Sequence, residues 1–155
     1  MAFIYETENF TVEAADQPHI TRTDGGHIRI FPKEKVVDRT ELSPEKAKEL
    51  MRLTIIVGEA MARGMNNRGV DIGRINYQDN GNWSVFKPEG PYLHYHLYGR
   101  AKSAKIHKWG NACHFPQRDT GFYDNFEPLN EGDIAEIRKQ IKEISKRDKY
   151  KLENW

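Results

Sequence analysis

The stretch that decides the fold is PYLHYHLYGRA, which runs from Pro91 to Ala101. It places His94 and His96 two residues apart among tyrosines and leucines. Because side chains of a β-strand alternate between its two faces, both histidines would share one face with Tyr92. The residues between them would form an apolar opposite face. The pattern therefore predicts a strand that carries two imidazoles along one side.

Segments on either side of this stretch also have recognisable patterns. The predicted strands cover residues 9–15, 27–33, 70–78 and 92–100. A long amphipathic helix is predicted between the second and third strands, with Ser43 as N-cap, Pro44 in the first helical position and Asn66 near its end. A second helix is predicted over 131–147, and the charged tail is expected to be partly disordered.

The order of strands, helix, strands and helix predicts an α+β fold with an antiparallel sheet. The length of 155 residues fits one domain, covering 1–155. Within it, residues 101–130 are rich in aromatic side chains but follow no regular period, so we expect an irregular segment there.

Composition excludes several classes of partner. The chain has 24 basic and 23 acidic residues, which gives no electrostatic argument for binding nucleic acid or a membrane surface. No apolar run reaches membrane-spanning length, and the start lacks the pattern of a signal peptide. The single cysteine, Cys113, excludes an internal disulfide and a zinc site built from several cysteines. We therefore expect a cytoplasmic protein with no nucleic-acid partner.

Three explanations fit two histidines on one strand face. They could be half-exposed surface residues or hydrogen-bonded partners beside the sheet. They could offer two ligands to a metal, but zinc usually needs a third protein ligand. The spacing of His107, Cys113 and His114 matches no zinc pattern, so no metal site is predicted. The third explanation is nucleophilic catalysis.

A neutral imidazole is a competent nucleophile near neutral pH, because its ordinary pKa is about 6.5. Attack on phosphorus would give a phosphoramidate that water later cleaves, which divides one difficult displacement into two easier ones. Such a site needs one ring nitrogen free and the other held by an acceptor. It also needs hydrogen-bond donors around the phosphoryl oxygens.

The residues resemble the histidine triad (HIT) superfamily, in which three histidines alternate with apolar residues. LHYHLYGR is similar to the signature of that family. The segments GGHIRIFPK, LSPEKAKELMRL, VDIGRIN and GNWSV resemble further family motifs, and all five occur in the family's order. The resemblance covers roughly residues 10–100 and implies a five-stranded antiparallel sheet with two helices.

The resemblance also implies roles for individual residues. His94 matches the nucleophile that becomes nucleotidylated on the α-phosphate, and His96 matches the histidine on the phosphate and leaving-group side. Tyr92 stands where the family has its first histidine, which is a departure from the pattern. His27 matches a histidine that packs beside the triad, where it would supply the missing imidazole or support the strand. Arg29 would lie near the site in this register. The alternative interpretation is that Arg29 is a charged residue exposed to solvent with no role in the site.

Other site residues follow from the same register. Asn76 matches a residue that binds phosphate or orients the site, and Ser84 matches a serine near the phosphate. Trp83 replaces the usual glutamine, and its alternatives are loop packing and contact with the substrate. The acidic residue that contacts ribose would be Glu13 or Asp16. Aromatic residues for the base would come from Phe10, Phe31 or the GFYDNF segment at 121–126, whose alternative is a small core or a dimer contact.

The predicted function is therefore a nucleotide-binding hydrolase or nucleotidyl transferase that acts through a nucleotidyl-histidine intermediate. It requires no cofactor, and any divalent metal is expected on the substrate phosphates. The alternative is a nucleotide-binding module of HIT fold with weak or no turnover, for which Tyr92 and the altered loop are the evidence. A homodimer is also predicted, because Ile55 and Ile56 lie off the main apolar stripe of the long helix.

Overall fold

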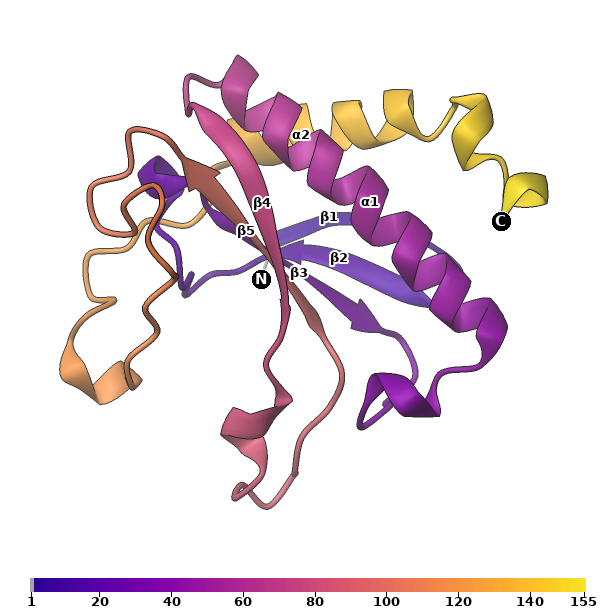
Figure 1. Cartoon of the computed structure of the whole chain (residues 1–155), viewed down its shortest axis with the longest axis horizontal. Coiled ribbons are helices and arrows are strands. Elements are labelled where there is room, and N and C mark those ends of the chain that lie inside the picture. The colour runs from indigo at the N-terminus through magenta and orange to yellow at the C-terminus, as the bar shows by residue number, and fades with distance from the viewer. Residues whose placement is uncertain (1) are drawn as a thin grey trace.

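The computed structural model describes residues 2–155, and its sheet and two helices confirm the α+β class (Figure 1). The strands are β1 (Ala2–Glu6), β2 (Phe10–Ala14), β3 (His27–Pro32), β4 (Ile72–Asp79) and β5 (Tyr95–Ala101). The helices are α1 (Pro44–Asn67) and α2 (Glu131–Ile144). All strand pairs are antiparallel, and the order across the sheet is β1-β2-β3-β5-β4. The histidine strand β5 therefore lies between two neighbours.

Both helices pack against one face of the sheet, so the opposite face is left for the site. The Ser43 side chain caps α1 by accepting from the N–H of Lys46, and α2 begins with a capping box between Asn130 and Asp133. The apolar stripes of the helices meet the inward side chains of the strands in a single core. Its fully buried members include Ile28, Ile30, Leu53, Val57, Met61, Leu97, Ile137 and Ile141.

The structure differs from the sequence prediction at four places. The short strand β1 was not predicted, although Ile4 within it is fully buried. The strand predicted over 92–100 joins the sheet only at Tyr95. The charged tail is not disordered, because short 3₁₀ turns follow α2 and Tyr150 is buried in the core. The second helix also ends at Ile144, earlier than predicted.

The segment 101–130 folds back over the face opposite the helices, with only a short 3₁₀ turn of its own. The buried carboxylate of Asp24 accepts hydrogen bonds from the three backbone N–H groups of residues 105–107. The guanidinium of Arg100 donates to the carbonyl oxygens of Lys108 and Asn111. Buried charged groups thus fix this irregular segment by bonding its backbone. Within residues 2–155, neither helix combines the length and apolarity needed to cross a membrane.

Candidate functional site

Strand register brings polar residues from four strands into rows on the face opposite the helices. Directly paired residues in an antiparallel sheet project their side chains to the same face. One row consists of Glu13, Arg29, His96 and Gln78, and the next consists of His27, Tyr98 and Asn76. The histidine predicted from GGHIRIFPK and the histidines of the signature stretch are therefore brought together by pairing of β3 with β5.

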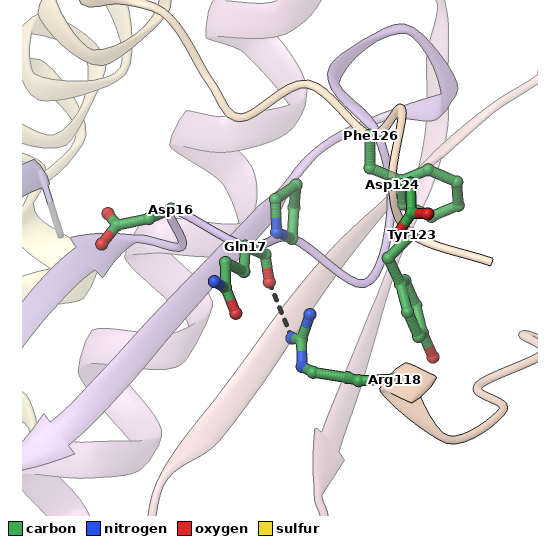
Figure 2. A pocket seen from close by; sticks show the side chains of 7 residues that line it. Asp16, Gln17, Arg118, Tyr123, Asp124 and Phe126 are labelled. Carbon is green, nitrogen blue, oxygen red and sulfur yellow. Dashed lines mark hydrogen bonds between the residues drawn. The ribbon is translucent and has the colours of Figure 1, made fainter. Parts of the chain in front are cut away.

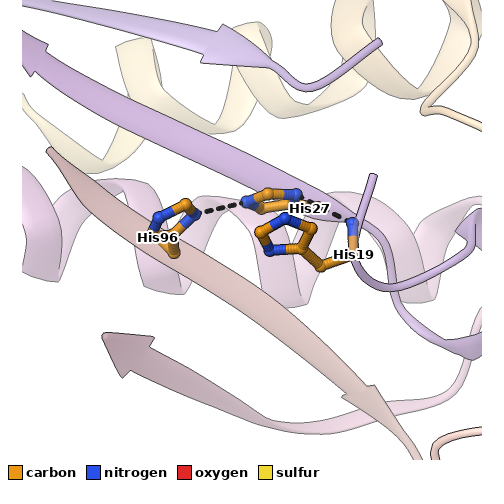
Figure 3. A group of neighbouring side chains, drawn as sticks. All are labelled: His19, His27 and His96. Carbon is orange, nitrogen blue, oxygen red and sulfur yellow. Dashed lines mark hydrogen bonds between the residues drawn. The ribbon is translucent and has the colours of Figure 1, made fainter. Parts of the chain in front are cut away.

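A backbone hydrogen bond fixes the protonation pattern of His27 and His96 (Figure 3). The backbone N–H of His19 donates to Nδ1 of His27 at 3.1 Å, and a backbone N–H can only donate. In the neutral ring the proton of His27 must then be on Nε2, which lies 2.8 Å from Nδ1 of His96. His27 is the donor in that bond, so the proton of His96 is on its own Nε2.

His94 has the opposite tautomer. Its Nδ1 lies 3.0 Å from the backbone carbonyl oxygen of Tyr92, which can only accept. The ring proton of neutral His94 is therefore on Nδ1, and Nε2 keeps its lone pair. The His94 and His96 rings meet edge to face with centroids 4.5 Å apart. A lone pair on one imidazole thus lies beside an N–H donor on the next.

The imidazoles of the cluster are held neutral. Burial is the main cause that lowers the pKa of His96 to about 2 and the pKa of His27 well below its ordinary value. Burial also lowers the pKa of His94, while its bond to the Tyr92 carbonyl acts in the opposite direction. The Arg29 guanidinium contributes to each of these shifts. A permanent positive charge therefore lies beside neutral imidazoles.

The sequence analysis did not identify His19 as part of this cluster. Its ring stacks on His27 with centroids 4.8 Å apart and lies 5.5 Å from the His96 ring. It belongs to the connection between β2 and β3, where no alternation of side chains marks it. Pro18, Gly25 and Gly26 nearby are typical of a turn and give no sign of a functional histidine. Only the folding of this connection over β3 and β5 places His19 on the cluster.

An aromatic stack surrounds the His94 ring. Phe31 lies nearly parallel to it at 5.4 Å between centroids, and the Tyr92 ring stacks at 4.9 Å. Tyr92 is partly exposed, and its hydroxyl forms no hydrogen bond within residues 2–155. The contribution of Tyr92 to the tautomer of His94 comes from its backbone, which any residue at this position would supply.

Of the other predicted site residues, Asn76 and Ser84 bond to groups outside the histidine cluster, whereas Trp83 contacts it. The Asn76 side-chain oxygen accepts from Arg100 at 2.7 Å, so it holds the neighbouring segment in place. The Ser84 hydroxyl donates to the carbonyl of Gly81 within its own turn. The Trp83 ring lies 5.5 Å from that of His19, so the loop between β4 and β5 reaches the cluster through its tryptophan.

No protein-family model and no curated protein sequence matches the chain, but solved structures do. A histidine triad protein from Sinorhizobium meliloti 1021 has a TM-score of 0.62 at 17% identity, over 92% of this chain and 87% of its own. A zinc-bound histidine triad family protein from Mycobacterium smegmatis gives 0.61 at 21% identity, over 92% and 85%. A hypothetical histidine triad nucleotide-binding protein from Sulfolobus tokodaii strain7 gives 0.61 at 17% identity, over 99% and 90%.

The chain has the histidine triad (HIT) fold. The resemblance predicted from five short motifs is confirmed at the level of fold, including the five-stranded antiparallel sheet and two helices. Position 92, where the resemblance predicted the first histidine of the signature, holds a tyrosine, and His19 adds an imidazole from outside the signature stretch.

A pocket of about 360 Å³ opens beside Pro18, the residue that precedes His19 in the chain (Figure 2). Its walls combine residues of the connection between β2 and β3 with residues of the irregular segment. They are Asp16, Gln17, Pro18, Arg118, Tyr123, Asp124 and Phe126. Of the two acidic candidates for a ribose contact, Asp16 lines this pocket, whereas Glu13 lies on the sheet beside Arg29. The GFYDNF segment thus faces the pocket through part of its length.

Three nitrogens of His19, His27 and His96 lie within 4.8 Å of one another, so we tested whether they fit a metal ion. The His19 ring stacks on the other two with interplanar angles of 24° and 27°. Lone pairs of imidazole lie in the ring plane, so those of stacked rings run side by side and do not converge. Holding a metal here would require a ring to turn and the His27–His96 hydrogen bond to break.

The neutral cluster makes stability depend on pH. His19, His27 and His96 are less basic in the fold than in the unfolded chain, where their pKa is about 6.5. The unfolded state therefore binds more protons as the pH falls, so folding stability is present above pH 6.5 and decreases below it. We expect the free energy of unfolding to fall by about 3 to 4 kcal/mol between pH 6 and pH 5.

Chemical denaturation at both pH values measures this change. The variant His19→Gln should show a fall about one third smaller, since it removes one of the three groups. A fall below about 1 kcal/mol in the wild type would mean that the rings are protonated in the fold.

A second prediction concerns Tyr92. Because its backbone carbonyl, and not its hydroxyl, bonds His94, we expect Tyr92→Phe to keep turnover within about twofold of the wild type. Tyr92→Ala removes the ring stacked on His94 and should slow turnover by several-fold to about tenfold. Steady-state kinetics of both variants on one nucleotide substrate make the comparison. A phenylalanine variant as slow as the alanine variant would show that the hydroxyl contacts the substrate.

Proposed function

We propose that this protein is a nucleotide hydrolase or nucleotidyl transferase that acts through a covalent nucleotidyl-His94 intermediate. The observation that carries the proposal is the hydrogen bond from Nδ1 of His94 to the Tyr92 carbonyl. That bond leaves the lone pair of Nε2 available. Nε2 of His94 has no hydrogen-bond partner within residues 2–155, and it is not among the buried unpartnered atoms, so it remains accessible to a ligand.

The reaction takes place in two displacements at the α-phosphorus. The Nε2 lone pair of His94 forms a bond to phosphorus, and the bond to the leaving group breaks with its electron pair. Nδ1 keeps its proton, so the nucleotidylated ring is cationic and its bond to the Tyr92 carbonyl becomes charge-assisted. Water then attacks phosphorus, loses a proton to solvent, and returns the electron pair to Nε2. The product is a nucleoside monophosphate.

Neighbouring groups are suited to stabilise the charge that develops on the phosphoryl oxygens. His96 presents an Nε2–H donor because His27 holds its other nitrogen. Arg29 is the register partner of His96, so its positive charge lies in the same row. Donors that are already oriented need no reorganisation during the reaction, which is the usual source of such stabilisation. In this scheme His27 is a positioning residue.

The alternative of an inactive binding module rested on Tyr92 and on the altered loop. The tautomer of His94 is set by a backbone carbonyl and that of His96 by His27, so neither depends on a histidine at position 92. This favours the enzyme. A nucleotide as substrate is also supported by the Sulfolobus tokodaii neighbour, which is described as nucleotide-binding. Transfer in place of hydrolysis would need an acceptor other than water.

We also propose that the protein forms a homodimer through α1 and β4. β4 is an edge strand, and it carries Tyr77 half exposed next to α1, where Met51 is also exposed. A groove of about 160 Å³ between Leu42, Met51 and Tyr95 continues this apolar surface. The sequence prediction of a dimer rested on Ile55 and Ile56, which lie off the main apolar stripe of α1. It is wrong for Ile56, because that side chain is buried in the core of its own chain.

Light scattering tests the dimer. The wild type should give twice the mass of the chain at concentrations of tens of micromolar (order of magnitude). Met51→Asp should shift the protein to a monomer, because it places a charge in an apolar interface. Leu152→Asp, at an apolar residue exposed elsewhere, should leave the mass unchanged. A wild type of monomer mass would contradict the proposal.

The covalent mechanism is tested by His94→Ala. We expect at least a thousandfold loss of turnover, equivalent to about 4 kcal/mol of barrier, with nucleotide affinity largely retained. Suitable substrates are nucleoside phosphoramidates, dinucleoside polyphosphates and nucleotide sugars, followed by monophosphate release. Mass spectrometry of the quenched wild type should detect the nucleotidyl adduct on His94.

The matched control is His114→Ala, which removes an exposed imidazole outside the cluster and should turn over normally. Wild-type turnover by His94→Ala would refute the assignment of the nucleophile. Retention of nucleotide without turnover by the wild type would favour the binding module.

A further inference from the structure

We propose that His19 is a catalytic hydrogen-bond donor that completes this site, with its Nε2–H directed at an oxygen of the substrate phosphoryl or leaving group. The inference rests on the proposed function and assigns a role to a residue outside every motif of the signature. It adds to the cluster an imidazole that the signature stretch does not supply.

A chain of hydrogen bonds fixes the tautomer of His19. The Asn80 side-chain amide donates to the hydroxyl oxygen of Tyr98 at 3.3 Å. The buried hydroxyl proton of Tyr98 still needs an acceptor, and among residues 2–155 the remaining partner of this hydroxyl is Nδ1 of His19, which lies 2.8 Å from its oxygen. Since Nδ1 accepts, the proton of neutral His19 is on Nε2. Tyr98 is fully buried, and burial raises its pKa, so the hydroxyl remains a donor.

The His19 ring is neutral in the physiological range. Burial is the main cause that lowers its pKa to about 4, and the charges of Arg118 and Arg29 act in the same direction. A neutral imidazole holds its remaining proton too strongly to transfer it, but it donates a hydrogen bond well. The role that fits this chemistry is therefore stabilisation of negative charge, with protonation of the leaving group left to solvent.

Position supports the same role. His19 stacks over His27 and His96, and three aromatic rings from two other segments border it, those of Trp83, Phe115 and Tyr123. Nε2 of His19 has no hydrogen-bond partner within residues 2–155, and it is not among the buried unpartnered atoms. It is therefore an accessible donor beside the cluster, and Tyr123, whose ring borders that of His19, also lines the pocket of Figure 2.

His19 thus acts on the site through two of its own groups. Its backbone N–H sets the tautomer of His27, and through it that of His96, while its side chain offers a donor in its own right. The nucleophile His94 and the donors His96 and His19 then present three accessible Nε2 atoms, one with a lone pair and two with protons. This is the set that a displacement at phosphorus requires.

Substitution of the side chain separates these two contributions, because the backbone N–H survives in every variant. We expect His19→Ala to lower kcat by 10²-fold or more while KM changes by less than about threefold, as is typical of a lost transition-state donor. His19→Gln places an N–H near the same position and should recover to within about tenfold of the wild type. His114→Ala removes an exposed imidazole outside the cluster and should stay within about threefold.

Tyr98→Phe gives a second test that keeps the fold of the cluster. It removes the proton donated to Nδ1, so the His19 tautomer is no longer fixed, and we expect kcat to fall by about three- to tenfold. Long-range ¹H–¹⁵N spectra of the imidazoles in the wild type should show His19 protonated on Nε2. The Nδ1–H tautomer in the wild type would overturn the proposal whatever the kinetics, as would normal kcat in His19→Ala.

The outcome of these experiments is distinguishable from failure of the proposed function. Loss of turnover in His94→Ala together with a normal His19→Ala leaves the mechanism standing and rejects the role of His19. If His94→Ala is itself active, the proposed function fails first. If His19→Ala does not fold, His19→Gln and the tautomer spectrum decide, and a His19→Gln protein slower than the wild type by 10²-fold or more would count against a simple N–H donor.

Discussion

The hydrogen bond from the backbone N–H of His19 to Nδ1 of His27 is the constraint on which the histidine cluster depends. A backbone amide never accepts, so this bond gives the His27 tautomer, which in turn gives that of His96. The Tyr92 carbonyl acts on His94 in the opposite sense, because a carbonyl never donates. Two backbone groups with fixed polarity thus leave a lone pair on Nε2 of His94 and a proton on Nε2 of His27 and of His96.

Burial makes this division persist at physiological pH. A protonated imidazole could not keep its assigned role, since both of its nitrogens would donate. Desolvation depresses the pKa of each ring in the cluster, and Arg29 adds a positive charge that opposes further protonation. The same charge would attract a phosphate. The imidazoles are therefore neutral, and the positive charge beside them is that of Arg29.

Two irregular segments close the site over the sheet. The loop between β4 and β5 brings Trp83 to His19, and the segment after β5 brings Phe115 and Tyr123. The latter has no regular structure of its own and depends on the buried carboxylate of Asp24 and on Arg100 for its position. Apolar rings on these segments exclude water from the imidazoles, which is the origin of their low basicity.

Local patterns in the sequence determined the strand that carries His96, the capped helix at Ser43 and the antiparallel α+β class, because side-chain period and capping are properties of neighbouring residues. The place of His27 beside the histidines of the signature stretch followed only from the resemblance. The place of His19 was decided by tertiary structure alone. Its contacts with Tyr98 and Trp83 join residues far apart in the chain, and no periodicity in a loop records such contacts. For the same reason the β1 strand and the buried Tyr150 escaped prediction, since each acquires its partners only when the sheet and helices have assembled.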